Sequence, residues 1–329
     1  MNGAEAAVRT MEQARVEVCF ANPGTSEMYL VDALDKSTTI RSVLVLFEGV
    51  ATAAADGYGR MARKPAATLL HLGPGFANGL ANLHNARRAR TPILNIVGDH
   101  AVAHLQYDTP LTSNIDAYAA ATEGWWRRSR EAASLSADIA DALTASCAGP
   151  GRTATVIVPA DHMWTDDVRP ADPSKPDGLG EVPDSLIEDV AEKCRSGGAA
   201  LLLGGNNGLE EALAAAGRIR DACGAHLFVD TFMPRLERGA GRVEVARLPY
   251  FADWIADTLK DVQHLILVGA NPPASFFAYK DQPSLAAPKG CEILTLATPR
   301  EDGARALDAL ARALDAPAGD ACVDATSTP

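Results

Sequence analysis

Short apolar runs alternate with amphipathic stretches along most of the chain. The runs are continuous rather than alternating, as in residues 93–97 and 154–158, and such runs between helices are typical of parallel strands buried on both faces. The sequence therefore predicts an α/β protein. In the first half we expect helices over 4–15, 26–34, 49–62, 77–89 and 134–146, and strands over 17–20, 43–47, 66–71, 92–97 and 153–158.

The alternation is interrupted once and then restarts. Residues 164–183 are rich in Pro, Asp and Gly, which is typical of a linker. We therefore expect two doubly wound parallel-sheet domains, with residues 1–165 and 184–315 as the domains, 166–183 as the linker and 316–329 as a flexible tail. In the second half we expect helices over 184–195, 208–222, 251–258 and 301–314, and strands over 199–203, 226–229, 264–268 and 292–296.

Composition narrows the class of protein. The 329 residues are 47% hydrophobic and carry 30 Lys and Arg against 42 Asp and Glu, a net charge of -12. An acidic chain is a poor partner for nucleic acid or for an anionic membrane. The N-terminus lacks a signal-peptide pattern, and no apolar stretch reaches a membrane span of about 18 residues. We therefore expect a cytoplasmic protein.

The six cysteines give no sign of a metal centre. They form no CxxC pair and no metal-ligand spacing. We therefore expect no metal ligands on this chain.

Three loops at predicted strand ends carry candidate chemistry. In open parallel sheets, ligands collect at the carboxyl ends of strands. The first loop, Ala-Asn-Pro-Gly-Thr-Ser-Glu over 21–27, is either a ligand loop or a capped turn with Glu27 in the first turn of the next helix. The second is Glu48, which follows the apolar run 43–47.

Glu48 is expected where water is scarce, at the end of a buried strand. A desolvated carboxylate suits proton exchange with a heterocycle nitrogen better than a surface glutamate does. The alternative is a glutamate that only favours a helix N-terminus.

The third loop is His-Leu-Gly-Pro-Gly-Phe-Ala-Asn over 71–78. A Gly-Pro-Gly turn leaves backbone groups bare, so that a flat ligand can approach. The loop lacks the lysine of a P-loop. His71 is either a catalytic group or a structurally satisfied histidine at a strand end.

Together, the three loops resemble the pyrimidine-binding domain of thiamine diphosphate enzymes. The order is Asn-Pro-Gly, then Glu-Gly-x-Ala-x-x-x-Ala-x-Gly-Tyr-x-Arg, then Gly-Pro-Gly-x-x-Asn. The sequence is most similar to acetolactate synthase large subunits, with benzoylformate decarboxylase as a more distant relative, over about residues 1–315. The resemblance implies a pyrimidine-binding domain followed by a Rossmann-like central domain.

The resemblance also implies roles for particular residues. In that family the glutamate binds the aminopyrimidine and favours the imino tautomer that activates the cofactor, which attacks a 2-oxo acid; Glu48 matches it. Asn22, Pro23 and Gly24 match the loop over the pyrimidine. Further matches are Pro74 and Asn78 as cofactor contacts, His71 as a proton-transfer and substrate residue, Thr25 as a substrate-facing residue, and Gln106 as a catalytic glutamine facing the thiazolium.

The family's diphosphate-binding domain, with its Gly-Asp-Gly motif, has no match in this sequence. Gly98-Asp99-His100 belongs to the first domain instead. We therefore expect a split 2-oxo acid decarboxylase or carboligase, active with a separate subunit that carries this domain and holds Mg²⁺ and the diphosphate. The alternatives are a scaffold or regulatory homologue, and a shortened form of a longer acetolactate synthase-like enzyme.

Two further expectations concern cofactors and assembly. The stretch Leu-Gly-Gly-Asn-Asn-Gly over 203–208 is a weak nucleotide-binding signal, and some family members hold FAD on this domain, so FAD is a secondary possibility. Self-association through the first domain is expected, with helix 49–62 and Trp125-Trp126 as candidate contacts.

Overall fold

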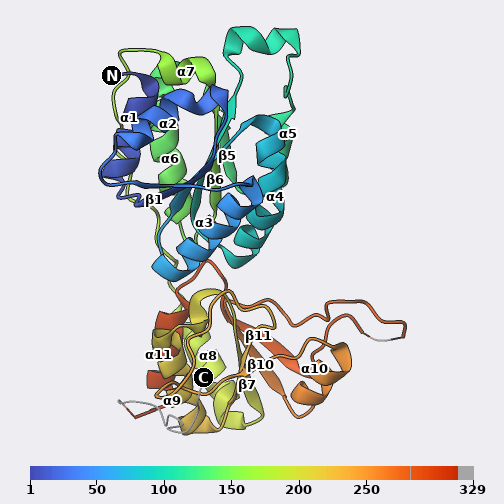
Figure 1. The fold of residues 1–329 in the computed structure, drawn as a ribbon. Helices are drawn as coiled ribbons and strands as arrows, with labels where there is room; N and C mark the ends of the chain where they lie inside the picture. The colour runs from blue at the N-terminus through green and yellow to red at the C-terminus, as the bar shows by residue number, and fades with distance from the viewer. Residues whose placement is uncertain (282, 318–329) are drawn as a thin grey trace. The chain divides into compact units, whose positions relative to one another are not determined.

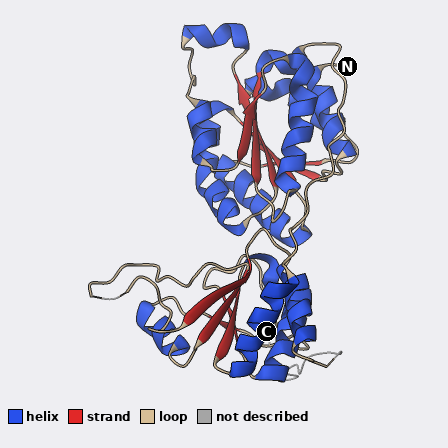
Figure 2. Cartoon of the chain, turned by 180° about the vertical axis from the view of Figure 1, so that it is seen from behind, coloured by secondary structure: helices blue, strands red, loops and turns tan. Residues whose placement is uncertain are grey.

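The computed structural model describes residues 1–281 and 283–317, so most of the expected tail 316–329 lies outside the described residues. The chain divides into two compact units, Met1–Gly178 and a second that begins at Leu179. Both are shown in Figures 1 and 2, and each is described by itself below. Among the described residues, none of the helices is long and apolar enough to cross a membrane.

The first unit is built on a parallel sheet with strand order β2-β1-β3-β4-β6-β5. The central strands β3, β4 and β6 are buried along their whole length, as the continuous apolar runs predict. The strands are β1 (Val18–Asn22), β2 (Arg41–Leu44), β3 (Ala66–Leu70), β4 (Ile93–Asp99), β5 (Trp125–Arg128) and β6 (Thr153–Pro159).

Helices cover both faces of this sheet, as Figure 1 shows. One hydrophobic cluster joins α1, α2 and α6 to one face, and another joins α3, α4 and α5 to the other. The helices are α1 (Gly3–Gln13), α2 (Met28–Asp35), α3 (Glu48–Ala62), α4 (Leu72–Ala89), α5 (Ile115–Ala121), α6 (Leu135–Cys147) and α7 (Ala160–Trp164), with short 3₁₀ turns at η1 (Thr25–Glu27), η2 (Val102–Tyr107) and η3 (Ala132–Ser134).

The second unit repeats the architecture with a parallel sheet of order β11-β10-β7-β8-β9. Helices α8, α9 and α11 pack on one face and α10 on the other. The elements are α8 (Asp184–Ser196), β7 (Ala199–Leu203), η4 (Gly205–Gly208), α9 (Glu210–Cys223), β8 (His226–Val229), β9 (Ala246–Arg247), α10 (Ala252–Leu259), β10 (His264–Val268), β11 (Glu292–Ala297) and α11 (Gly303–Ala313). The predicted fold class is confirmed.

The prediction of a buried strand over 43–47 was wrong. The strand is β2, it ends at Leu44, and it lies at the edge of the sheet. Leu44 is 73% exposed and Leu46 is 95% exposed. An apolar run alone does not distinguish a strand with two neighbours from an edge strand whose apolar side chains meet solvent or another protein.

The Gly-Pro-Gly stretch also differs from its prediction as a turn. It forms the first turn of α4, which begins at Leu72 rather than near residue 77. Proline is tolerated in a first helical turn because its missing N–H would have no partner there. Leu72 takes the strained positive φ of 52° that redirects the chain from β3 into the helix.

A row of polar side chains crosses the buried centre of the first sheet. The Thr68 hydroxyl donates to Asn95 Oδ1 at 2.6 Å, and Asn95 Nδ2 donates to the Thr155 hydroxyl at 3.2 Å. All three residues are fully buried. These hydrogen bonds connect β3, β4 and β6 through their side chains as well as through their backbones.

Candidate functional site

Glu48 is the first residue of α3 and is only 8% exposed. Its carboxylate therefore lies at the positive end of the helix dipole. The carboxylate accepts a hydrogen bond from Asn78 Nδ2, with Oε2 at 2.9 Å. The structure thus joins two of the residues singled out from the sequence, one from each of the helices α3 and α4.

Gly75 lets the two helices meet at the carboxylate. A Cβ atom on Gly75 would lie 2.7 Å from Glu48 Oε1, and any side chain there would displace the glutamate. Thr52 closes the same junction, because its hydroxyl contacts the Gly79 carbonyl at 3.1 Å. Pro74, beside Gly75 in the same turn, is exposed.

Asn22 fixes the segment that leads into Glu48. Its Nδ2 donates to the Val45 carbonyl at 2.7 Å, so the end of β1 holds the chain between β2 and α3. Pro23 follows it and is half-buried.

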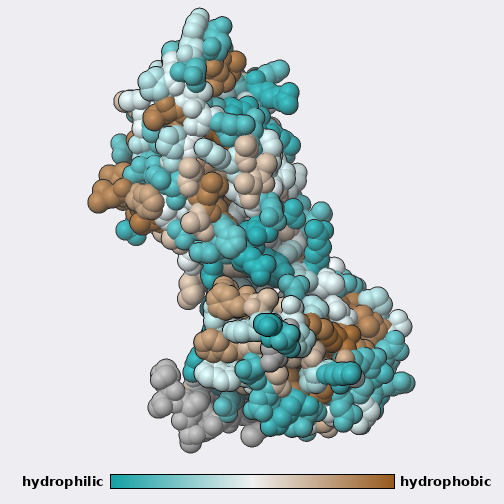
Figure 3. Space-filling view, turned by 90° about the vertical axis from the view of Figure 1, so that its right-hand side faces the viewer, coloured by the Kyte–Doolittle hydropathy of each residue, from teal (hydrophilic) through white to brown (hydrophobic). Residues whose placement is uncertain are grey.

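The side chains around Glu48 form an apolar rim on the surface, which consists of Leu44, Leu46, Phe47 and Val50. Figure 3 shows that hydrophobic side chains also gather elsewhere on the surface.

His71 lies at the end of β3 beside a buried glutamate. Its Nδ1 is 2.7 Å from Oε2 of Glu27, whose side chain is fully buried. The same oxygen accepts the Gly24 amide hydrogen at 2.7 Å. The imidazole rests directly on Gly24, where a Cβ atom would lie 2.3 Å from the ring. The structure therefore joins the first and third loops through Glu27, which the sequence places only in the first turn of the next helix.

Burial raises the pKa of the Glu27 carboxyl, and the Gly24 amide and the His71 charge oppose the rise. The second oxygen, Oε1, is buried without a hydrogen-bond partner. It fits against Gly98, where a Cβ atom would overlap it at 1.7 Å. A sequence signal existed, because Glu27 lies three residues after the Gly24 of Asn-Pro-Gly. Its distance from His71, however, depends on the pairing of β1 with β3.

Gln106 lies apart from these pairs, on η2. Its Nε2 donates to the Ala103 carbonyl of the same turn at 2.9 Å, and its side chain is exposed. It lines a cavity of about 690 Å³ together with Thr25, Tyr29 and His104. The structure thus places Gln106 near the predicted substrate residue Thr25, and among the described residues Gln106 forms no hydrogen bond with Glu48 or His71.

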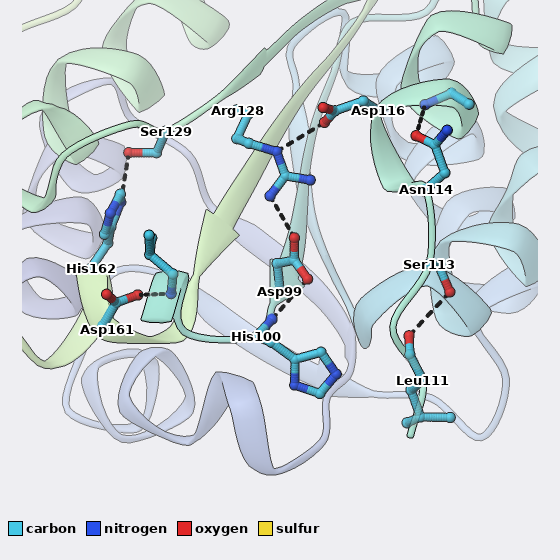
Figure 4. Close-up of polar contacts among 12 residues, drawn as sticks. Asp99, His100, Leu111, Ser113, Asn114, Asp116, Arg128, Ser129, Asp161 and His162 are labelled. Carbon is cyan, nitrogen blue, oxygen red and sulfur yellow. Dashed lines mark hydrogen bonds and ion pairs between the residues drawn. The ribbon is translucent and has the colours of Figure 1, made fainter. Parts of the chain in front are cut away.

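Charged side chains anchor the base of the segment between β4 and α5. This segment carries η2 and is drawn in turquoise in Figure 1. Arg128 bridges Asp99, at the end of β4, and Asp116 on α5, at 2.5 and 3.0 Å (Figure 4). The Val102 amide donates to Asp161 on α7 at 3.0 Å. The segment is therefore held at its base by Arg128 of β5 and, at the start of η2, by Asp161 of α7.

In the second unit, the glycine-rich turn over 203–208 is filled by its own asparagine. Asn207 Nδ2 donates to the carbonyls of Gly204 and Val268, at 2.9 and 3.1 Å. Gly269 and Gly303 enclose the same side chain, and a Cβ atom on either would lie 2.4 Å from it. The geometry therefore gives this turn a structural role.

Comparison with known proteins assigns the first unit to a family. Residues 1–120 match the family described as "Thiamine pyrophosphate enzyme, N-terminal TPP binding domain". The protein named "Putative acetolactate synthase large subunit IlvX" of Mycobacterium tuberculosis is 51% identical over 316 residues, which cover 96% of this chain and 60% of that protein. Acetolactate synthase 3 of Brassica napus is 38% identical over 96 residues, 29% of this chain and 15% of that protein.

Solved structures share the fold. A structure described as "a putative thiamin diphosphate-dependent enzyme" from Mycobacterium smegmatis superposes with a TM-score of 0.83 at 20% identity, covering 97% of this chain and 64% of that one. Benzoylformate decarboxylase from Polynucleobacter necessarius gives a TM-score of 0.81 at 17% identity, covering 100% and 63%.

The fold, the glutamate at the start of α3 and these matches define the class of the first unit: residues 1–120 match the N-terminal domain of thiamine diphosphate-dependent enzymes. The chain as a whole is similar to acetolactate synthase large subunits, and it spans about 60% of the length of the Mycobacterium tuberculosis relative. The resemblance that the sequence predicts is confirmed.

Proposed function

We propose that this chain provides the pyrimidine side of a thiamine diphosphate site in a decarboxylase or carboligase that acts on a 2-oxo acid. The observation that carries the proposal is the buried Glu48 carboxylate, held by Asn78 and approached closely by Gly75. The 2-oxo acid is proposed from the similarity to acetolactate synthases.

The residues present fit the pyrimidine end of the cofactor. Glu48 offers a carboxylate in a largely dry position, and Asn22, Pro23, Gly24, Pro74 and Asn78 are the proposed surrounding contacts. When bound, thiamine diphosphate supplies the carbon centre that attacks the keto group and stores the electron pair left by decarboxylation. FAD remains a secondary proposal for the second unit.

The chain's own groups would bind and exchange protons. The Glu48 carboxylate would accept a hydrogen bond from a protonated ring nitrogen, and the low water content would strengthen that bond. His71, with its ring partly exposed, would exchange a proton with bound substrate. Thr25 and Gln106, which line one cavity, would contact the substrate.

We further propose a separate subunit that contributes the diphosphate-binding domain and holds Mg²⁺. What supports a protein partner is the apolar rim around Glu48. Leu44, Leu46, Phe47 and Val50 are all about half exposed or more, and exposed apolar patches beside a functional group are typical of interaction surfaces. Self-association through the first unit is the alternative use of this rim.

The decisive measurement is native mass spectrometry of the chain purified from its own cells with Mg²⁺ and thiamine diphosphate. We expect an assembly that contains a second polypeptide of about one domain and the cofactor. In that assembly, Glu48→Gln should lower kcat by at least about 100-fold, the lower range for a lost proton-transfer group.

A matched control is Glu211→Gln, which removes the charge of an exposed glutamate in the first turn of α9 and should leave activity unchanged. Wild-type rates in Glu48→Gln would contradict the catalytic role. An assembly that never takes up thiamine diphosphate would favour the scaffold or regulatory alternative.

A further inference from the structure

Glu27 has an environment that helix capping does not require. It is completely buried, and its Oε1 has no hydrogen-bond partner. A capping carboxylate is normally open to water, since exposure costs nothing and burial of a charge is expensive. Here two glycines, Gly24 and Gly98, make the space that the carboxylate and its histidine neighbour occupy.

The hydrogen bonds of the Glu27 carboxylate indicate which atom is the donor and which is the acceptor. Oε2 already accepts the Gly24 amide hydrogen, and an ionised carboxylate can only accept. When Glu27 is ionised, the His71 nitrogen 2.7 Å away is the donor, so the ring proton of the neutral imidazole lies on Nδ1. Within the described residues this is the ring's one hydrogen bond, so Nε2 keeps its lone pair for an incoming group.

Several of the other charged groups on the elements packed against Glu27 have hydrogen-bond or ion-pair partners of their own. The elements that pack most extensively against η1 are α2, α7 and β4. Asp99 of β4 pairs with Arg128, and Asp161 of α7 accepts the Val102 amide hydrogen. His162 of α7 is hydrogen-bonded to Ser129. The remaining acidic residues on these elements are Asp32 and Asp35 of α2.

We propose that Glu27 is a positioning residue that holds His71 with Nδ1 inward and protonated and Nε2 outward as the proton acceptor. The inference rests on the proposed function only where it states that Nε2 accepts a proton during the reaction. The tautomer itself is a property of this chain. A histidine needs a fixed tautomer to accept protons from one direction, and a partner on the far nitrogen is the usual means of fixing it.

The test is ¹⁵N NMR of the imidazole nitrogens in the full-length chain, at a pH where the ring is neutral, with His71→Asn used to assign the signals. In the wild-type chain we expect the non-protonated signal at Nε2. In Glu27→Met, which removes the acceptor, we expect it to move to Nδ1. In Glu27→Gln, whose amide oxygen can accept from both Gly24 and His71, we expect the wild-type pattern to return.

A wild-type His71 ring protonated on Nε2 would overturn the proposal, even if Glu27→Met failed to fold. An unchanged tautomer in a folded Glu27→Met would do the same. In the holoenzyme, Glu27→Met and His71→Asn should each reduce kcat by about 100-fold or more, and the double variant should lose no more than the single ones. Normal tautomers with an inactive holoenzyme would count against the proposed function and leave the role of Glu27 standing.

Discussion

Adding one methyl group at Gly75 tests the geometry around Glu48 directly. In Gly75→Ala the new Cβ would lie 2.7 Å from Glu48 Oε1, whereas ordinary contact begins near 3.4 Å. The carboxylate must therefore withdraw by about 0.7 Å. Movement along the bond to Asn78 would lengthen that hydrogen bond from 2.9 Å to about 3.6 Å, beyond hydrogen-bonding range.

Folding should tolerate this change while function should not. The atom displaced is the end of a flexible side chain, and alanine favours a helix over glycine by about 1 kcal/mol, so the free energy of unfolding should fall little or not at all. A misplacement of about 1 Å in a reacting group costs about 100-fold. We therefore expect kcat/KM of the assembled enzyme to fall by one to two orders of magnitude (about 10- to 100-fold), with thermal stability within a few degrees of wild type.

Gly57→Ala is the matched control. Gly57 lies on the same helix as Glu48, and a Cβ atom there has nothing within 4 Å. It should gain the helix propensity and keep wild-type activity. The assays are steady-state kinetics of the assembled enzyme and urea denaturation of the chain. Full activity in Gly75→Ala together with a large loss in Glu48→Gln would refute the claim that Gly75 sets the carboxylate's position.

Three further predictions concern buried polar groups. Asn95→Leu leaves two buried threonine hydroxyls without their partner and should lower the free energy of unfolding by about 2–5 kcal/mol, measured in urea. Thr91→Val removes the 2.6 Å hydrogen bond to Asp56 and should cost about 1–3 kcal/mol in the same assay, while Thr39→Val, which removes an exposed contact, should cost less. Burial raises the pKa of Glu27, so wild-type stability should fall as the pH rises through the interval from about 4.5 to that raised value. The stability of Glu27→Gln relative to wild type should therefore increase with pH. A constant difference in stability between about pH 4 and 8 would contradict this sign.

The local pattern of apolar residues was sufficient to predict a strand where the strand is enclosed on all sides. Strands β3, β4 and β6 have neighbours on both sides and helices on both faces, so their side chains are uniformly apolar and their positions follow from the sequence. The same pattern misled at residues 43–47, because an edge strand that presents apolar side chains outward has the composition of a buried one. The short elements α5, α7, β5 and β9 carried too few residues for a period to be recognised.

The sequence by itself determined the α/β class, the order of the three loops and the glutamate at the start of α3, because these depend on residue type and on spacing within single elements. Only the tertiary structure decided which atoms meet. Glu27 and His71 are 44 positions apart, and Glu48 and Asn78 are 30 apart. Their distances depend on parallel pairing of β1 with β3 and on the packing of α3 against α4 across glycines. These are contacts between distant segments, which no local period encodes.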